Sequence, residues 1–188
     1  MIDLIAEAAL LQTFLEEKGW DFFFIGGVAV QVWGQPRMTQ DIDLTVFTNL
    51  KNEPEYIDAF LSRYSPKFSD AGQFALTNRV LPMLTQGGIG VDVTLAGLSD
   101  ISEALARSSY QSFVGGHNLR ICSADDLVIM KTVAGRPRDW IDIESVIIRQ
   151  NNLEWDYILL TLEGLGAYED LSAKLENLSN LRSEFYQR

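Results

Sequence analysis

The chain has 188 residues, of which 47% are hydrophobic and 22% charged, and its formal net charge is −11. This composition excludes a disordered or fibrous chain, and the length leaves room for one sizeable core, with or without a small helical appendage. A single cysteine, Cys122, cannot form a disulfide within the chain or build a structural zinc site with the single histidine, so any metal should be held by oxygen atoms.

The negative charge and the lack of long apolar stretches also limit the expected partners. A strongly acidic chain repels a phosphate backbone, so nucleic-acid binding through bulk charge is not expected, and a small or cationic acceptor fits better. The first twenty residues lack a basic start followed by an apolar block, and no stretch is long enough to cross a bilayer. We therefore expect a cytoplasmic protein with no membrane partner.

The first part of the chain is expected to alternate helices and strands. Residues 2–18 carry apolar side chains at helical spacing, which predicts a helix that covers the core. Residues 22–25 are apolar throughout and end at the pair Gly26–Gly27, which predicts a short strand followed by a turn. Helical character resumes over 28–33, so the expected order is strand, glycine turn and helix.

Polar and apolar side chains then alternate over residues 41–47. Asp41, Asp43 and Thr45 fall on one face of this segment and the intervening apolar residues on the other, which predicts a half-buried strand. A helix is expected over 55–64, because apolar residues recur there at spacings of three and four.

The middle of the chain predicts a β-hairpin. Residues 79–85 and 89–96 have strand character, and the glycine-rich turn at Gly87–Gly88 joins them. A further short strand is expected over 118–122.

The last third of the chain is expected to be helical. Ser123 with Asp126 three residues later has the form of a capping box and predicts the start of a helix over 127–133. Further helices are expected over 140–150, 155–163 and 171–185. We therefore predict an α/β (α+β) fold with a core over 1–122 and a helical region over 123–188 that packs on it, or else one single domain.

The acidic residues of the strand over 41–47 suggest chemistry. Side chains two positions apart on a strand lie on the same face, with Cα atoms about 6.5 to 7 Å apart, so the carboxylates of Asp41 and Asp43 repel each other. A cation between them would relieve this repulsion, and oxygen ligands suit Mg²⁺ or Mn²⁺. A solvated polar face on an edge strand is the alternative.

A third acid strengthens the metal interpretation. Asp92 lies in the second strand of the predicted hairpin, which is expected to pair beside the strand of Asp41 and Asp43. Such a cluster could hold two divalent ions about 4 Å apart, which would brace the attacking and leaving oxygens of an in-line phosphoryl displacement. Asp92 would then also be placed to take the proton of an acceptor hydroxyl.

The glycine pair has two interpretations. Gly26 and Gly27 open a helix directly after a strand, and backbone N–H groups at such a helix start can hold an anion such as a triphosphate. A tight turn without ligand binding is the alternative, since the segment lacks the lysine of a P-loop.

Taken together, Ile25-Gly26-Gly27 and, after thirteen intervening residues, Asp41-Ile42-Asp43-Leu44 resemble the glycine and double-acid motif of the polymerase β-like nucleotidyltransferase superfamily. Further segments resemble small bacterial nucleotidyltransferases, including the group of AbiEii-type abortive-infection toxins. These segments are Arg37–Asp43, a hairpin of Phe74–Val80 with Val91–Leu95, Cys122–Leu127 with Lys131, and Gly135–Trp140. The resemblance runs from about Phe24 to Gln150 and leaves the final helices unassigned.

The resemblance implies a fold, a reaction and a site. The fold is a mixed-sheet nucleotidyltransferase core flanked by helices, with a C-terminal helical region. The reaction is transfer of a nucleoside monophosphate from an NTP, with Mg²⁺ or Mn²⁺, to a hydroxyl acceptor, and it releases pyrophosphate. Gly26 and Gly27 are implied to bind the triphosphate, and Asp41, Asp43 and Asp92 to bind the metal as the catalytic residues.

Several other residues are candidates for nucleotide binding. Arg37 and Thr39 precede the acidic strand, where a cation could meet the leaving pyrophosphate, although a surface arginine in a turn is the alternative. The resemblance to small bacterial nucleotidyltransferases implies that Lys131 faces the nucleotide, and an exposed helical lysine is the alternative. Arg136 and Arg138, next to Asp139, either grip phosphate or only join two helices.

The acceptor and two competing functions stay open at this point. A small hydroxylated molecule such as an aminoglycoside, or a protein side chain, fits the acidic chain better than an RNA 3′ end, which the toxin resemblance nevertheless keeps open. A catalytically inactive nucleotide-binding or toxin–antitoxin module with the same fold is the main alternative. A hydrolase that uses the same acids with water as the nucleophile is another.

Overall fold

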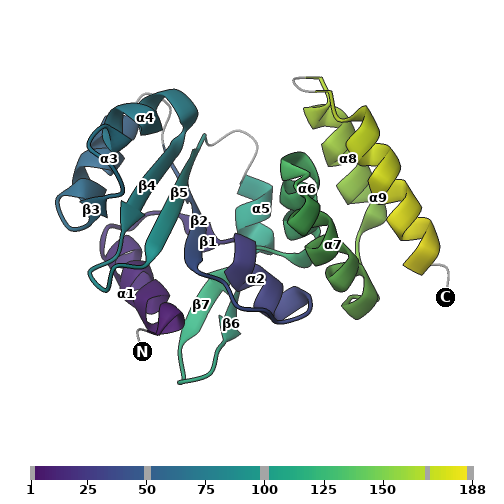
Figure 1. Ribbon diagram of the computed structural model, residues 1–188, viewed down its shortest axis with the longest axis horizontal. Coiled ribbons are helices and arrows are strands. Elements are labelled where there is room, and N and C mark those ends of the chain that lie inside the picture. The colour runs from purple at the N-terminus through teal and green to yellow at the C-terminus, as the bar shows by residue number, and fades with distance from the viewer. Residues whose placement is uncertain (1–2, 49–51, 98–101, 168–169, 186–188) are drawn as a thin grey trace. The chain divides into compact units, whose positions relative to one another are not determined.

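A computed structural model describes residues 3–48, 52–97, 102–167 and 170–185 (Figure 1). The chain divides into two compact units. The first unit consists of Met1–Val28 and Met38–Cys122, and the second of Ala29–Arg37 and Ser123–Arg188. Helix α2, Gly26–Trp33, begins in the first unit and continues into the second.

All described strands belong to one mixed sheet in the first unit, in the order β3-β4-β5-β2-β1-β7-β6. Parallel pairing joins β2 to β5 and β1 to β7, and the other neighbours are antiparallel. The strands are β1 Phe22–Phe24, β2 Asp41–Phe47, β3 Ser65–Pro66, β4 Val80–Leu84, β5 Gly90–Ala96, β6 Ser109–Ser112 and β7 Asn118–Ile121. The mixed sheet implied by the family resemblance is confirmed. The predicted hairpin is found as the antiparallel pair of β4 and β5.

Helices cover this sheet and complete the core of the first unit. They are α1 Leu4–Glu17, α3 Glu53–Leu61, α4 Ala71–Asn78 and α5 Ser102–Arg107. Helix α1 contacts β2 and β7, and its Phe14 packs with the aromatic rings of Trp20, Phe60 and Tyr64. The three phenylalanines of β1 are fully or almost fully buried, as expected for a central strand that is apolar throughout.

The second unit is helical apart from its connections. Helix α6, Ala124–Ala134, contacts α7, Pro137–Arg149, as well as α8, Trp155–Leu165, and α9, Ser172–Phe185. The side chain of Ser123 accepts a hydrogen bond from the backbone N–H of Asp126, so the predicted N-cap of α6 is confirmed. Gly135, with φ of +62°, ends α6, and Pro137 begins α7.

One expected element is wrong. The segment Phe74–Asn78, which the family resemblance assigned to a hairpin, belongs to helix α4. The hairpin begins only after Arg79, whose left-handed φ of 56° ends the helix and turns the chain into β4. Among the described residues, none of the helices combines the length and the apolar character that a membrane span requires.

Candidate active site

Strand register brings the predicted acids onto one face of the sheet. Asp43 of β2 is the direct partner of Asp92 on the parallel strand β5, and Asp41 is the partner of Gly90. Neighbouring residues in register point to the same side, and so do residues two apart along one strand. Asp41, Asp43 and Asp92, which we call the acid set, therefore share one face. The expectation that the strand of Asp92 pairs beside that of Asp41 and Asp43 is confirmed.

A lysine that was not among the predicted site residues contacts the acid set. The ammonium nitrogen Nζ of Lys67 lies 2.8 Å from Oδ1 of Asp92 and 4.0 Å from Oδ1 of Asp41. The side chains of Asp41 and Asp92 are 54% and 41% exposed, and that of Lys67 is 27% exposed. Water therefore reaches both carboxylates, and one ammonium balances part of their charge.

Glycines leave the space that these side chains occupy. A Cβ on Gly26 would overlap the carboxylate of Asp43, and a Cβ on Gly90 would overlap Oδ1 of Asp41. The same Cβ on Gly90 would also lie 3.1 Å from the Nζ of Lys67. Gly26 additionally has a left-handed φ of +58°, which a side chain would disfavour. A larger residue at either glycine would therefore displace an acid.

The glycine turn also packs closely against Thr39. Gly26 and Gly27 open helix α2, as predicted, and the N–H of the preceding Ile25 donates to the carbonyl of Asp43. A Cβ on Gly27 would overlap the side-chain oxygen of Thr39, which itself donates to the carbonyl of Asp41. The turn, Thr39 and the acid set thus form one contiguous part of the first unit.

The residues of the acid set fit a divalent ion in their chemistry. Their donors are all carboxylate oxygens, which Mg²⁺ and Mn²⁺ prefer, and the Lys67 ammonium shows that the position accepts a cation. With the side chains as they lie, no group of three or more His, Cys, Asp or Glu residues within the described ranges is arranged to hold a metal ion. Side-chain rotation at exposed carboxylates is therefore needed for all three to serve as ligands.

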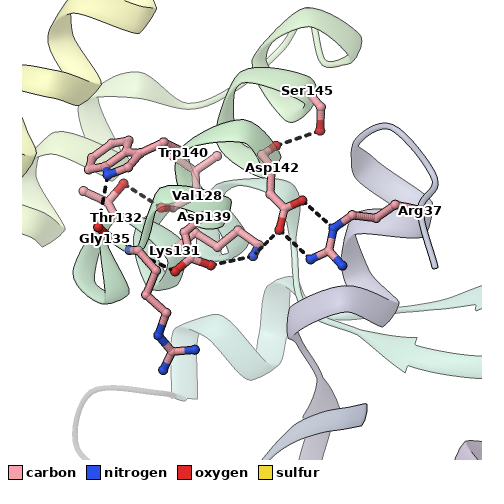
Figure 2. Close-up of polar contacts among 10 residues, drawn as sticks. Arg37, Val128, Lys131, Thr132, Gly135, Asp139, Trp140, Asp142 and Ser145 are labelled. Atoms are coloured by element: carbon pink, nitrogen blue, oxygen red, sulfur yellow. Dashed lines mark hydrogen bonds and ion pairs between the residues drawn. The ribbon is translucent and has the colours of Figure 1, made fainter. Parts of the chain in front are cut away.

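The second unit holds a different charged cluster (Figure 2). Arg37 binds Asp142 through two hydrogen bonds, from Nε to Oδ1 and from Nη2 to Oδ2, each 2.7 Å long. Lys131 contacts the same carboxylate through Nζ at 2.7 Å and also donates to Asp139 at 2.9 Å. We call Arg37, Lys131, Asp139 and Asp142 the ionic network. It contains two cations and two carboxylates, so its charges balance.

The ionic network is more deeply buried than Asp41 and Asp92 of the acid set. The side chains of Asp142 and Lys131 are only 2% and 8% exposed. Burial of the Asp142 carboxyl by itself raises its pKa, but the hydrogen bonds and charges of Arg37 and Lys131 outweigh burial and hold that pKa below its usual value. The carboxylate of Asp142 is thus ionised wherever the protein is folded near neutral pH.

These contacts concern residues that the sequence predicts to bind nucleotide. Arg37 and Lys131 are bound to carboxylates, and Lys131 is buried rather than exposed. Arg136 and Arg138 are exposed at the start of α7, where the N–H of Arg136 donates to Asp139. Nucleotide binding by these four residues stays a prediction. Asp142 was missed by the sequence analysis, although it lies three residues after Asp139, and both belong to helix α7.

A comparison of the sequence with protein families decides which family is present. The family described as "Nucleotidyl transferase AbiEii toxin, Type IV TA system" matches residues 9–184, which is nearly the whole chain. The chain belongs to this AbiEii family. The resemblance inferred from the glycine and acid motifs is thereby confirmed, and the protein is nucleotidyltransferase-like. No curated protein matches the chain.

Solved structures support the same fold for this AbiEii family member. An antigenic nucleotidyltransferase-like protein from Paracoccidioides brasiliensis is similar with a TM-score of 0.51 and 18% identity, over 93% of this chain and 92% of that one. The antibiotic-resistance factor ANT(2″)-Ia is similar with a TM-score of 0.50 and 20% identity, over 98% of this chain and 90% of that one. Likeness at this identity shows the fold alone, and the predicted nucleotidyltransferase core is confirmed.

Proposed function

We propose that this protein transfers a nucleoside monophosphate from an NTP to a hydroxyl acceptor, with a divalent metal ion. The observation that carries the proposal is the register of Asp43 beside Asp92, on the same face as Asp41, in a chain of the AbiEii family. Neighbouring carboxylates repel one another, and a divalent ion would relieve this repulsion. The acids also lie beside the glycine turn Gly26–Gly27, whose backbone N–H groups would bind a triphosphate.

The proposal gives each candidate site residue of the first unit a role. Asp41, Asp43 and Asp92 would hold Mg²⁺ or Mn²⁺, which supplies positive charge to the triphosphate and to the oxygens that attack and leave. The backbone N–H groups of Gly26 and Gly27 would bind triphosphate oxygens, with Thr39 packed against the turn.

At the α-phosphorus, the reaction forms one bond to oxygen and breaks another. The acceptor hydroxyl oxygen attacks the α-phosphorus, the bond from that phosphorus to the bridging oxygen breaks, and pyrophosphate leaves. Asp92 takes the hydroxyl proton in this scheme, and its carboxylate is 41% exposed, so an acceptor from solution can reach it. Arg37, Lys131, Arg136 and Arg138 are proposed as further phosphate contacts. They rank below Gly26 and Gly27, because Arg37 and Lys131 already bind carboxylates.

The acceptor is proposed from charge. A net charge of −11 favours a cationic small molecule or a protein side chain over an RNA 3′ end. A fold resembling that of the antibiotic-resistance factor ANT(2″)-Ia is compatible with a small-molecule acceptor.

Labelled nucleotides test the reaction directly. The protein is incubated with each α-³²P-NTP and Mg²⁺, alone and with an aminoglycoside, a protein extract or tRNA, and the label is followed into each acceptor. We expect labelled product and pyrophosphate with the wild type, and neither with EDTA or with Asp41→Asn plus Asp43→Asn. Release of orthophosphate in place of pyrophosphate would contradict the proposal and indicate a hydrolase.

One observation favours the alternative of a catalytically inactive nucleotide-binding or toxin–antitoxin module. The ion pair of Lys67 with Asp92 partly neutralises the acid set without a metal, as a non-catalytic protein would need. Calorimetric titration with NTP and Mg²⁺ distinguishes the two functions. Nucleotide binding without consumption, with every acceptor tried, would favour the module.

A further inference from the structure

Lys67 reaches the acid set along a row of residues that starts just after β3 and continues across β4, β5 and β2. Strand β3 ends at Pro66, and the N–H of the next residue, Lys67, still donates to the carbonyl of Pro82 on β4. Pro82 is the register partner of Asp92 on β5, and Asp92 is that of Asp43 on β2. The row therefore reads Lys67, Pro82, Asp92 and Asp43 across neighbouring strands.

The geometry of this row explains why a lysine is suited to the position. Two strand spacings separate Lys67 from Asp92, which is about 10 Å between Cα atoms. The extended stem of a lysine bridges such a gap when the intervening residue is short, and Pro82 is compact and buried. The terminal ammonium then arrives at the carboxylate of Asp92, and the missing side chain of Gly90 leaves room for it beside Asp41.

The contacts of Lys67 compete with any divalent ion on the acid set. The ammonium lies 2.8 Å from an oxygen of Asp92, and a metal ligated by that oxygen would face it at close range with the same sign of charge. The Lys67 side chain is partly exposed and flexible, so it can leave. Its new partner must be an anion near the acid set.

We propose that Lys67 is a nucleotide-binding residue that the acid set holds in place until the nucleotide arrives. Its ammonium partly neutralises Asp92 and Asp41 in the nucleotide-free protein, and it transfers to the triphosphate when the carboxylates serve as metal ligands. The inference rests on the proposed function and adds a phosphate-binding cation in the first unit. A triphosphate is the anion that suits Lys67, because the negatively charged triphosphate and the divalent ion bind at the same position.

Two binding measurements on Lys67→Met test the proposal without relying on catalysis. Mn²⁺ binding to the nucleotide-free protein is followed by electron paramagnetic resonance. Binding of a non-hydrolysable α,β-methylene triphosphate with Mg²⁺ is followed by calorimetry. We expect Lys67→Met to bind Mn²⁺ about three- to tenfold more tightly, because a competing cation is gone. We expect it to bind the triphosphate about tenfold more weakly, because a charge-assisted contact is lost.

Matched variants control for charge and folding. Lys18→Met removes the same charge from a lysine that lies over the Phe14 ring, so its two affinities should equal those of the wild type. Lys67→Arg keeps the charge and should retain triphosphate binding to within about threefold. Circular dichroism and the melting temperature verify that each variant is folded.

The outcomes separate this inference from the proposed function. If the wild type binds Mn²⁺ and the triphosphate but Lys67→Met differs from it in neither affinity, or in only one, the exchange of partners by Lys67 is wrong and the proposed function stands. If the wild type binds neither probe, both fail. Opposite shifts in the two affinities, absent in Lys18→Met, support the exchange.

Discussion

The acid set and the ionic network contain the same kinds of charged groups but differ in balance and exposure. The acid set has three carboxylates, of which Asp41 and Asp92 contact the Lys67 ammonium, and the side chains of these two acids are about half exposed. The ionic network has two carboxylates for two cations, and Asp142 and Lys131 are almost fully buried. A buried cluster must balance its charges to be tolerated, whereas an exposed cluster can keep an excess that a ligand later neutralises.

This difference teaches which charged residues hold the fold and which are available for chemistry. The carboxylates of Asp142 and Asp139 satisfy Lys131 in the folded chain, so removing one partner leaves an uncompensated buried charge. Removing a carboxylate from the acid set should cost less, because water reaches Asp41 and Asp92 and their ion pairs with Lys67 are partly exposed. The following predictions, from the largest expected effect to the smallest, test that distinction.

Lys131→Met should cause the largest loss of stability. It leaves Asp139 and Asp142 buried without one of their cations, which costs about 3 to 5 kcal/mol of unfolding free energy. Urea unfolding followed by circular dichroism measures the change. Lys67→Met is the control and should cost less than about 1 kcal/mol, because its ion pairs are partly exposed. Equal losses in the two variants would remove the distinction between the clusters.

Asp43→Asn should separate activity from stability. Loss of a carboxylate at the centre of the acid set should lower nucleotide transfer about a hundredfold or more. The melting temperature should change little, because Asp43 lies at a partly exposed position of β2. Transfer assays and thermal unfolding provide the two measurements. A fall in stability without a fall in activity would indicate that Asp43 is structural.

Arg37→Lys should have a moderate effect that distinguishes the two roles considered for Arg37. An ammonium cannot reproduce the two parallel hydrogen bonds to Asp142, so we expect a loss of about 1 to 2 kcal/mol in unfolding free energy. If Arg37 acts only in the ionic network, NTP affinity of the folded variant should be unchanged by calorimetry. Weaker NTP binding with unchanged stability would instead assign Arg37 to the nucleotide.

The acid dependence of stability should show the smallest effect. Because Arg37 and Lys131 lower the pKa of Asp142 in the folded protein, this group stabilises the fold above the unfolded pKa, which is near 3.8. The contribution is lost as the pH falls through the lower folded pKa. Unfolding free energy measured from pH 5 to pH 2 should fall less steeply in Asp142→Asn than in the wild type. An identical slope would mean that Asp142 does not titrate in this way.

Local patterns in the sequence were sufficient for much of the fold. The strand Asp41–Phe47 has the predicted bounds, because polar and apolar residues alternate without interruption, and Ser123 caps α6 as expected. Strand β3 has only two residues and no pattern of its own, since it is defined by pairing with β4. Helix α4 was missed because its weak apolar periodicity follows a polar loop.

The site was predictable only as far as it depends on spacing along the chain. The shared face of Asp41 and Asp43 follows from strand geometry, and the place of Asp92 follows from the expected pairing. Lys67 and Asp92 are 25 positions apart in sequence, and their contact depends on the short strand β3. No local pattern therefore indicates this contact. The pairing of Lys131 with Asp142 likewise requires the turn between α6 and α7.

Gly90 offers a way to silence this protein that leaves its titratable groups untouched. Because a methyl group at this position would collide with the carboxylate of Asp41 and crowd the Lys67 ammonium, Gly90→Ala displaces two opposite charges at once. The total charge, and with it any long-range attraction for a cationic acceptor, stays as it was. Such a variant would report on local placement separately from electrostatic steering, which no exchange of Asp for Asn can do.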